Sequence, residues 1–302
     1  WGNSPETMAA QILAEHLTID PADISFTYSD TDSGLNGTGP GGSRYTVMIA
    51  GALTGAAAKI KEKLLTVGGH MLEASAGDLE LVDGRVSLKG APEHGKTIAE
   101  VALHAHYFRL SMPDDPTLTS GIDATHVYDH PLTTLPNDDR TDLGVFYPIM
   151  GHMCHMPVVE VDIETGKIEF LDYVAVHDAG TMVNPMTLKG HIRGGTASGI
   201  GTAMSEHFYY DENGQLLNAS FADYLIPTLH ELPFDLRTGH VETPSPFTEY
   251  GIKGGGEGGR MGAPPAIASA IEDALRPLGV KIDELPVTPC RLRSLIRAAI
   301  KH

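Results

Sequence analysis

Cysteine is nearly absent from this sequence of 302 residues, which contains only Cys154 and Cys290. Two cysteines so far apart cannot form a disulfide framework or a four-cysteine metal site, and their scarcity indicates a reducing, cytoplasmic setting. Long apolar runs are also missing: none approaches the roughly 20 residues that span a bilayer. No basic segment followed by an apolar one opens the chain. We therefore expect a cytoplasmic protein without a membrane span.

Basic residues are scarce as well. The sequence has 21 Lys and Arg against 39 Asp and Glu, which gives a formal net charge of -18. Such a charge repels phosphate backbones and anionic lipid headgroups, so we expect neither nucleic acid nor a membrane surface as a partner. The hydrophobic fraction of 41% is nevertheless high enough for a chain of this length to bury a sizeable core. A disordered protein is thereby excluded.

The sequence pattern predicts hairpins and helices in mixed order. The first helix runs to Leu17 after Ser4-Pro5-Glu6, because Ser is a good N-cap and Pro suits the first helical position. Because the chain opens with Trp1 directly before this helix start, we expect that a preceding segment has been removed, left out or placed on another chain. The other predicted elements are a strand over 24–28, hairpins over 79–88, 158–176 and 208–217, and helices over 45–65, 264–278 and 289–300.

Residues 113–146 are rich in Pro, Asp and Thr and show no periodicity, so we expect a long loop or domain connection there. The alternation of hairpins and helices on both sides of this loop predicts an α+β fold. We expect two related halves, each of a mixed sheet and helices, over residues 1–150 and 151–302.

Glycine, in contrast, is abundant, with 34 copies. Three Gly-rich loops, over 34–42, 190–201 and 251–262, each precede a predicted helix. Such loops let the backbone approach a ligand, and each helix start presents N–H groups with partial positive charge. Three converging helix starts could therefore hold one large anionic cofactor. The alternative is that the glycines make turns and close helix contacts, and for each loop taken alone both interpretations stay open.

The third Gly-rich loop contains a glutamate within the run Lys253 to Arg260, KGGGEGGR. This run matches GxGxxG, but a dinucleotide-binding fingerprint needs a strand-helix-strand context and a loop without negative charge. Glu257 would repel a phosphate, and little strand character follows the helix. A carboxylate between glycines is better suited to act as a general base, because no neighbouring side chain blocks it and enclosure away from water would strengthen it as a base. The alternative is an ordinary solvated loop glutamate.

Histidine and cysteine occur together near the start of the second half, at His152, Cys154 and His155. A strand alternates its faces, so His152 and Cys154 would point one way and His155 the other. Too few ligands then share a face to bind a metal ion, and we expect packing roles. We also expect His104 and His106 to share a strand face and to be structural.

An anion-binding arrangement is predicted at Gly41-Gly42-Ser43-Arg44. This run places a hydroxyl, a guanidinium and N–H groups at the start of the helix predicted over 45–65, although a surface cap is the alternative. Asp178 and Asn184-Pro185 are typical of turns, in which Asp and Asn bind local backbone groups. We predict no catalytic role for them.

Several segments in a fixed order resemble the molybdopterin-binding subunits of the xanthine oxidase and aldehyde oxidase family. The strongest resemblance is the run from Gly251 to Ala268, GIKGGGEGGRMGAPPAIA, in which Glu257 falls on the family's glutamate beside the molybdenum. Further similar segments cover nearly the whole chain: Glu6-Thr7, Asp30-Thr31-Asp32, Gly41-Gly42-Ser43-Arg44, Val159-Glu160-Val161-Asp162, Thr165-Gly166, Asn184-Pro185, Gly199-Ile200-Gly201 and Asp223-Tyr224.

The resemblance implies the C-terminal half of the molybdopterin-binding part of a molybdenum hydroxylase. Such an oxidoreductase hydroxylates an electron-poor carbon of an N-heterocycle or aldehyde with oxygen from water, and Glu257 would be its base. The cofactor would be molybdopterin with molybdenum, as such or in the cytosine dinucleotide form. Expected partners are a second molybdopterin subunit, an iron-sulfur subunit and an FAD subunit, which would receive the electrons. A subunit divided between two chains, similar to that of nicotinate dehydrogenase, would account for the length and for Trp1.

The residues expected at the cofactor follow from the same resemblance, and none is expected to bind the metal directly. They are Gly2, Asn3, Gly41, Gly42, Ser43, Arg44, His191, Ser198, Gly255 and Gly256. Asn3, His191 and Ser198 stand where the family usually has Gln, and Ser4-Pro5 also departs from the pattern. His191 and Ser198 favour an alternative function, a non-catalytic scaffold subunit of the same kind of complex. Glu257 argues against it, because a scaffold needs no carboxylate among these glycines.

Overall fold

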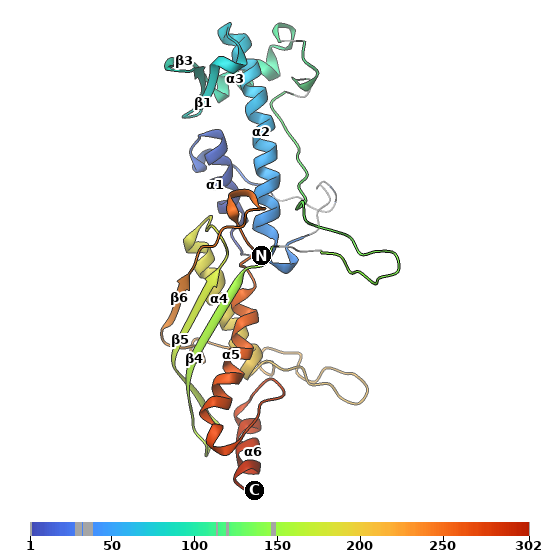
Figure 1. Ribbon diagram of the computed structural model, residues 1–302, viewed down its shortest axis with the longest axis vertical. Coiled ribbons are helices and arrows are strands. Elements are labelled where there is room, and N and C mark those ends of the chain that lie inside the picture. Colours follow the sequence, from blue (N-terminus) through green and yellow to red (C-terminus); the bar gives the residue numbers. More distant parts are fainter. Residues whose placement is uncertain are drawn as a thin grey trace. The chain divides into compact units, whose positions relative to one another are not determined.

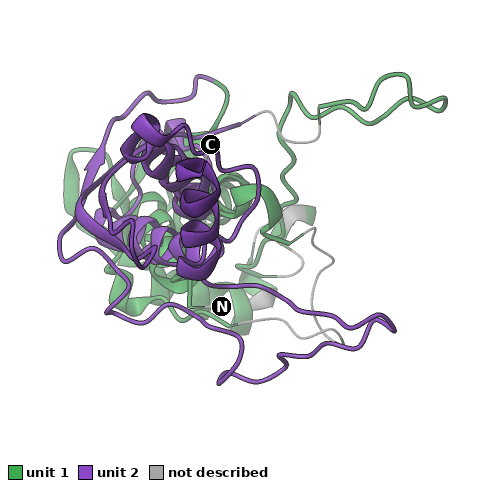
Figure 2. Cartoon of the chain, turned by 90° about the horizontal axis from the view of Figure 1, so that it is seen from below, with its two compact units in different colours: residues 1–148, 247–249 green, residues 149–246, 250–302 purple. Residues whose placement is uncertain are grey.

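A computed structural model describes residues 2–27, 32, 39–112, 114–118, 121–145 and 149–301. The chain divides into two compact units, residues 1–148 with 247–249, and residues 149–246 with 250–302 (Figure 2). In the described residues each unit combines helices with one three-stranded sheet. The predicted α+β class is therefore confirmed. The assignment of 1–150 and 151–302 as two molybdopterin-binding subdomains stays a prediction.

Unit 1 is built around the long helix α2 (Tyr45–Leu72), along which α1 (Pro5–Leu17) packs (Figure 1). The first helix is confirmed, but Ser4 adopts a left-handed conformation and its side chain makes no cap hydrogen bond. Helix α2 continues seven residues beyond the predicted end at Leu65. The reason is that Gly68 is a packing residue: a Cβ there would lie 2.5 Å from Cγ1 of Val86, so the glycine lets the helix approach the sheet closely.

The sheet of unit 1 is antiparallel, in the order β1 (Leu79–Val82), β2 (Arg85–Leu88) and β3 (Ala91–Thr97). The predicted hairpin is confirmed, because Asp83 and Gly84 have φ angles of 48° and 67°, the two positive values that a tight two-residue hairpin turn needs. Strand β3 was not expected. The core between this sheet and the helices contains Leu64, Val67, Leu79, Leu81, Val86, Val101, Ala105 and Leu118.

Two predictions in unit 1 are wrong. Residues 24–27 form no strand and follow a short 3-10 turn, Pro21–Asp23, while Tyr28 lies outside the described residues. His104 and His106 do not share a strand face, because they lie on helix α3 (Ile98–Tyr107). That helix begins with a capping box, in which Thr97 accepts from the Glu100 N–H and the Glu100 carboxylate accepts from the Thr97 N–H.

The predicted loop over 113–146 is confirmed in its described parts, which contain no strand and no helix beyond the 3-10 turn Pro116–Leu118. It is not free of the unit. The Lys63 ammonium on α2 donates to the Asp123 carbonyl oxygen at 2.7 Å and to the Gly121 carbonyl oxygen at 3.1 Å. These bonds fix the loop along α2.

Unit 2 contains the sheet of β4 (His152–Val161), β5 (Ile168–Asp178) and β6 (Leu236–His240). The predicted hairpin is confirmed, since β4 and β5 pair antiparallel with a bulge between Val158 and Val159. Strand β6 pairs with β5 in parallel, which local patterns did not predict. The isolated bridge Tyr210↔Leu216 is all that forms of the hairpin predicted over 208–217.

Helices α4 (Pro185–Met204) and α5 (Gly258–Ala274) lie side by side against this sheet, followed by α6 (Pro289–Ile300) (Figure 1). The last helix is confirmed, with Thr288 as its N-cap. Helix α5 begins six residues before the predicted start at Pro264. The core of unit 2 includes Tyr173, Ala175, Ile192, Ile200, Ala203, Ala263, Ile267, Ile271, Val287, Leu292 and Ile296.

The prediction of a Gly-rich loop over 190–201 is wrong, because these residues lie inside α4. A Cβ on Gly195 would lie 3.0 Å from the Arg260 nitrogen, and one on Gly199 would lie 3.1 Å from the Arg260 carbonyl oxygen. The glycines therefore let α4 and α5 approach each other closely, as in the alternative interpretation for this segment.

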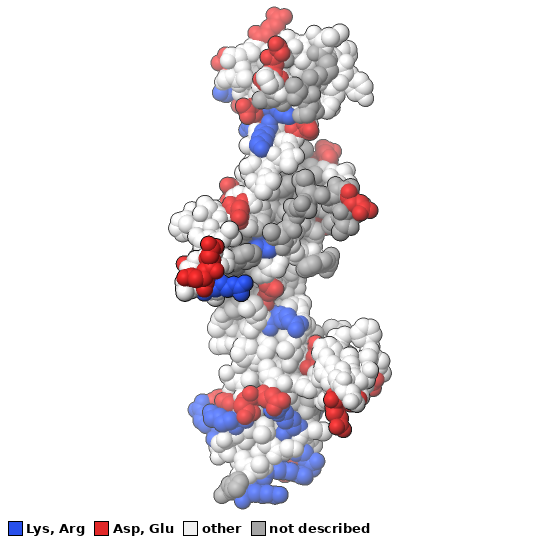
Figure 3. Space-filling view, turned by 90° about the vertical axis from the view of Figure 1, so that its right-hand side faces the viewer, with Lys and Arg blue, Asp and Glu red and all other residues white. Residues whose placement is uncertain are grey.

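Some of the charges at the end of unit 2 that carries α6 form ion pairs. On the face shown in Figure 3, basic residues near the C-terminus lie next to a band of acidic ones. Arg291 contacts Glu284 at 2.6 Å, and Lys281 contacts Glu272 at 3.4 Å. No helix in the described part of the chain has the length and apolar character required to cross a bilayer.

Candidate functional site

Glu257 lies where the third Gly-rich loop of unit 2 becomes helix α5. It is the N-cap residue, with φ -98° and ψ -7°, and its side chain makes no cap hydrogen bond. The side chain is exposed, whereas the following Gly258 and Gly259 are buried. The carboxylate therefore stands at the positive end of a helix of 17 residues, which favours negative charge there. In this chain considered by itself, the Glu257 side chain is not enclosed away from water.

The glycines after Glu257 hold the first turns of α5 close to their neighbours. A Cβ on Gly258 would lie 2.8 Å from Nδ1 of His177 on β5, and one on Gly262 would lie 2.5 Å from Cδ2 of His155 on β4. A Cβ on Gly259 would lie 2.5 Å from the Ile192 carbonyl oxygen on α4. These approaches are shorter than Cβ atoms tolerate, so the site requires glycine at the start of α5.

A chain of hydrogen bonds runs beneath this helix start. Nε2 of His155 lies 3.0 Å from Nε2 of His177, and Nδ1 of His155 lies 3.1 Å from the Tyr173 hydroxyl. Burial, together with the neighbouring His155 and His240, lowers the pKa of His177 to about 4. Burial also lowers the pKa of His155 and raises that of Tyr173. Both imidazoles are therefore neutral at physiological pH.

Asp178, the last residue of β5, is a buried acceptor for groups from three segments. Its carboxylate accepts from the Gly180 N–H at 2.8 Å, from the hydroxyl and N–H of Thr243, and from the Lys253 ammonium at 3.1 Å. Burial opposes the charge, but these hydrogen bonds outweigh it and hold the pKa of Asp178 well below its usual range. The turn role predicted for Asp178 accounts only for its hydrogen bond from the Gly180 N–H. The contacts with Thr243 and Lys253 span 65 and 75 residues, and no local pattern indicates them.

The backbone of the glutamate loop is attached to the same strand end. The Lys253 N–H donates to the Ala179 carbonyl oxygen at 2.8 Å, and Gly180 and Ile252 form a bridge. The Thr181 N–H donates to the Gly251 carbonyl oxygen at 3.3 Å. The loop thus begins as a short extension of the sheet, six residues before Glu257.

The other predicted site residues of unit 2 lie on α4 and in the loop. His191 and Ser198 are seven residues apart on α4 and so share one helix face. The Ser198 hydroxyl accepts from the Arg260 guanidinium on α5. Gly255 is half-buried and Gly256 is exposed. The structure thus connects one of the two α4 residues to the helix that follows Glu257.

The remaining predicted site residues lie in unit 1. Gly2 has a φ of 73° at the start of the chain, next to Asn3. The run from Gly41 to Ser43 forms a 3-10 turn in which Gly42 and Ser43 have positive φ angles, directly before α2. Arg44, the N-cap of α2, is buried, and its Nε donates to the Gly39 carbonyl oxygen at 3.3 Å. Their assembly with Glu257 into one cofactor site stays a prediction.

The prediction of three Gly-rich helix starts is wrong in one case. Helices α2 and α5 follow Gly-rich loops, but α4 follows Asn184, whose side chain accepts from the Thr187 N–H at 3.0 Å and caps the helix. The starts of α2 in unit 1 and of α5 in unit 2 therefore follow Gly-rich loops as predicted.

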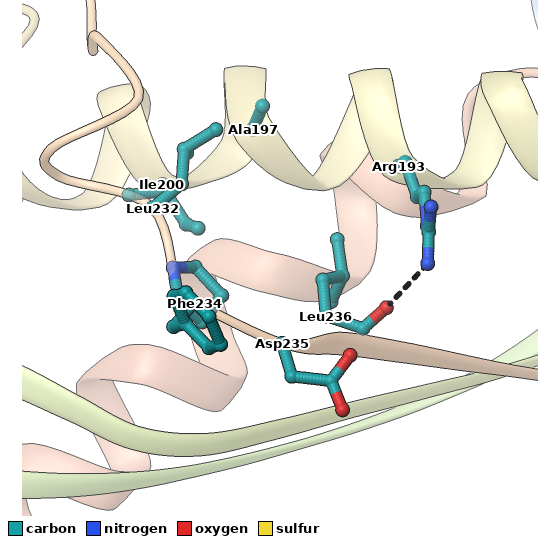
Figure 4. Close-up of a pocket in the computed structure, with 8 residues that line it drawn as sticks. Arg193, Ala197, Ile200, Leu232, Phe234, Asp235 and Leu236 are labelled. Atoms are coloured by element: carbon teal, nitrogen blue, oxygen red, sulfur yellow. Dashed lines mark hydrogen bonds between the residues drawn. The ribbon is translucent and has the colours of Figure 1, made fainter.

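The described residues contain no group of three or more His, Cys, Asp and Glu side chains that could hold a metal ion. His152 and Cys154 are exposed on β4, while His155 turns inward to His177, as the alternation of a strand requires. Figure 4 shows a pocket of about 210 Å³ elsewhere in unit 2, where the Arg193 guanidinium donates to the Leu236 carbonyl oxygen at 3.3 Å. Its lining includes no predicted site residue, and we assign it no role.

Comparison with known proteins identifies the family. Residues 1–233 match the family model described as molybdopterin cofactor-binding domain. The chain belongs to this family. It is 36% identical over 289 residues to the nicotine 6-hydroxylase large subunit of Paenarthrobacter nicotinovorans, covering 95% of this chain and 33% of that protein. It is 35% identical over 291 residues to the carbon monoxide dehydrogenase large chain of Afipia carboxidovorans, covering 96% of this chain and 33% of that protein.

Solved structures show the same fold. Quinoline 2-oxidoreductase from Pseudomonas putida 86 matches 98% of this chain and 35% of its own, with a TM-score of 0.81 and 37% identity. The molybdopterin cofactor-binding domain that the resemblance implied is thereby confirmed. The chain spans about one third of the length of the relatives it matches.

Proposed function

We propose that this chain is the glutamate-bearing part of a molybdenum hydroxylase and that Glu257 is the general base of its reaction. The observation that carries the proposal is the placement of Glu257 at the N-cap of α5, on a Gly-rich loop fixed at both ends. Its neighbours are glycines, so substrate and cofactor can approach the carboxylate. The substrate class is an electron-poor carbon of an N-heterocycle or an aldehyde, with water as the oxygen source.

The residues present fit an anionic pterin cofactor. Helix α2 begins after Gly41 and Gly42, and a Cβ on either glycine would meet nothing within 4 Å, so a phosphate could approach this helix start closely. Ser43 and Arg44 add a hydroxyl and a guanidinium. We propose Gly255, Gly256, His191 and Ser198 of unit 2, and Gly2 and Asn3 of unit 1, as further cofactor-binding residues. When bound, the molybdenum cofactor would activate water and accept two electrons from the substrate.

The part that this chain plays in the reaction is proton transfer and orientation. The Glu257 carboxylate would accept the proton of the activated water, which general bases achieve with rate gains of about 10² to 10⁴. The buried Gly258 and Gly259 allow the first turn of α5 to pack closely against its neighbours. This packing would fix the position of Glu257, which directly precedes them.

The partners proposed are a second molybdopterin subunit, an iron-sulfur subunit and an FAD subunit in the cytoplasm. The names of several relatives support partner chains, since they are called a large subunit, a large chain or a complex subunit. The iron-sulfur and flavin subunits would carry the electrons away from the site.

The test is Glu257→Gln in the complete assembly, with turnover and bound molybdenum and pterin measured side by side. The substitution preserves the size of the side chain and removes its basic oxygen. We expect stoichiometric cofactor in both forms and a turnover at least about 100-fold lower in the variant. Glu212→Gln, in an exposed turn of the same unit, is the control and should keep full turnover. A variant that keeps more than about a tenth of the parent rate favours the scaffold function.

A further inference from the structure

Two successive residues at the end of β5 hold the two ends of the glutamate loop. Asp178 binds the side chain of Lys253, four residues before Glu257, and the ring of His177 packs against Gly258, the residue directly after Glu257. We propose that Asp178, through its buried ion pair with Lys253, is a positioning residue that sets the place of the Glu257 carboxylate. The inference rests on the proposed function in that Glu257 is taken as the base.

The ion pair is buried, unlike an ordinary surface pair. The Lys253 side chain is 13% exposed and that of Asp178 is 10% exposed, at 3.1 Å. The Thr243 hydroxyl lies between them, since the Lys253 ammonium contacts its oxygen at 2.5 Å and the hydroxyl donates to Asp178. The pair Asp172–Arg237, on β5 and β6, has side chains 38% and 55% exposed. Only a buried pair leaves a costly uncompensated charge when one partner is removed.

Before Glu257, the loop between the two anchors has no side chain of its own to determine its path. Residues 254–256 are three glycines, and a glycine backbone has the widest conformational freedom. The run contributes no side chains of its own: a Cβ on Gly255 would lie 2.7 Å from Cβ of Ala179 and 3.3 Å from Cδ1 of Leu188, and a Cβ on Gly151 would lie 2.1 Å from the Gly254 carbonyl oxygen. The position of Glu257 therefore depends on where the loop is attached before and after it.

The attachment at Lys253 combines side chain and main chain. The Lys253 ammonium binds the Asp178 carboxylate, while the Lys253 N–H donates to the carbonyl oxygen of Ala179, the residue that follows Asp178. Loss of the Asp178 charge would leave the Lys253 ammonium buried without a counter-ion, and the lysine would turn outward to reach water. The main-chain bond to Ala179 would then strain or open. A displacement of about 1 Å at a catalytic group can lower the rate by up to about 100-fold.

The experiment compares Asp178→Asn, Lys253→Met and the conservative Lys253→Arg in the complete assembly. Three quantities are measured: kcat and KM, bound molybdenum, and hydrogen-exchange protection of the peptide covering residues 252–258. We expect Asp178→Asn and Lys253→Met to lower kcat at least about 10-fold, to change KM less than about 3-fold and to lower the exchange protection at least about 10-fold. Lys253→Arg keeps the ion pair and should restore kcat to within about 3-fold of the parent.

The matched control is the exposed pair on the same strand. Asp172→Asn and Arg237→Met remove comparable charges from a pair open to solvent, and neither should change kcat or the exchange of residues 252–258. Thr243→Val is the milder variant if Asp178→Asn does not assemble. It keeps both charges but removes the hydroxyl between them, and we expect a smaller fall in both kcat and protection.

The outcomes separate this inference from the proposed function. If Glu257→Gln is inactive while Asp178→Asn and Lys253→Met keep kcat and exchange protection within about 3-fold of the parent, the positioning role is overturned and the proposed function stands. If Glu257→Gln retains turnover, the general-base function fails. Lower exchange protection in Asp178→Asn would then still support Asp178 as the anchor of the loop, and unchanged protection would overturn that as well.

Discussion

The imidazoles of His155 and His177 share a hydrogen bond of 3.0 Å between their Nε2 atoms, beneath the first turn of the helix that follows Glu257. One ring must donate and the other accept, so both cannot be protonated at these nitrogens. The Tyr173 hydroxyl on Nδ1 of His155 is compatible with either direction of the chain. In both directions the two rings are neutral, which suits a buried position at the positive end of a helix.

The first prediction is that acid destabilises the protein through this pair. The groups facing His177 are His155 from β4 and His240 from β6, and burial with these neighbours lowers its pKa to about 4. An unfolded histidine has a pKa near 6.5, so between about pH 6.5 and 4 the unfolded chain binds a proton that the folded one does not. The contribution to stability is therefore complete above about pH 6.5 and is lost progressively as the pH falls toward 4.

The lowering of the His177 pKa from 6.5 to about 4 sets the size of this effect. It corresponds to on the order of 3 kcal/mol in the free energy of unfolding. The free energy of unfolding of the assembly should be measured by denaturant titration at several pH values. His177→Gln should flatten the curve between pH 6.5 and 4, whereas His94→Gln, at an exposed histidine, should not. An equal slope in His177→Gln and the parent protein would contradict the prediction.

The second prediction concerns the close packing of α5. Gly258→Ala should destabilise the protein, because the new Cβ would lie 2.8 Å from Nδ1 of His177 and overpacking costs about 1–3 kcal/mol. It should also lower turnover, because the displaced helix carries Glu257. Gly194→Ala is the control in α4: a Cβ there meets nothing within 4 Å, and Ala is favoured over Gly in a helix by up to about 1 kcal/mol. Thermal unfolding that ranks the two variants in the opposite order would refute the packing role.

Local signals in the sequence were sufficient for elements whose stabilising contacts are also local. Asp83-Gly84 predicts its hairpin because the turn alone needs two positive φ angles. Thr288-Pro289 predicts the start of α6 because the cap bond reaches only to Arg291. The strand predicted for His104 and His106 shows the opposite case. Their alternation fits a strand, but the capping box of Thr97 and Glu100 was the stronger signal and indicates a helix.

The rest could not be predicted because it depends on residues distant in sequence. In the sequence, the glycines of α4 resemble a loop. In the structure, Gly195 and Gly199 lie against the Arg260 backbone and form the surface on which α5 packs. Asp178 resembles a turn residue until Lys253, 75 residues later, is seen beside it. Glu257 was found through its glycine neighbours and a family resemblance. The anchors that hold its loop gave no signal in the sequence.

The third prediction tests the N-cap of the last helix. The Thr288 hydroxyl accepts from the Arg291 N–H at 3.3 Å, and Leu292 and Ile296 of that helix are fully buried in the core of unit 2. Thr288→Ala should lower the free energy of unfolding by about 1 kcal/mol, and Thr288→Ser should retain most of it. Turnover of the folded assembly should not change, since α6 carries no predicted site residue. A loss above about 3 kcal/mol would mean that Thr288 does more than cap the helix.

The last prediction concerns the apolar side chains of residues 205–235, the long segment between α4 and β6, drawn in tan in Figure 1. Phe221 is 87% exposed, Leu229 is 86% exposed and Phe234 is fully exposed. Large apolar residues that are exposed in one segment are typical of a surface that another part of a protein or another chain covers. We therefore expect the isolated chain to be inactive and to bind a hydrophobic dye, and the complete assembly to suppress that binding.

The double variant Phe221→Ser with Leu229→Ser tests this surface directly. Because both side chains are exposed in this chain, the substitutions should change its free energy of unfolding by less than about 0.5 kcal/mol, as is usual for surface positions. They should weaken co-purification with the remaining subunits at least about 10-fold, since two apolar contacts at an interface are lost. Leu171→Ser, at a leucine of β5 that is 62% exposed, is the control and should leave assembly unchanged. Full assembly of the double variant would show that residues 205–235 do not form the contact surface.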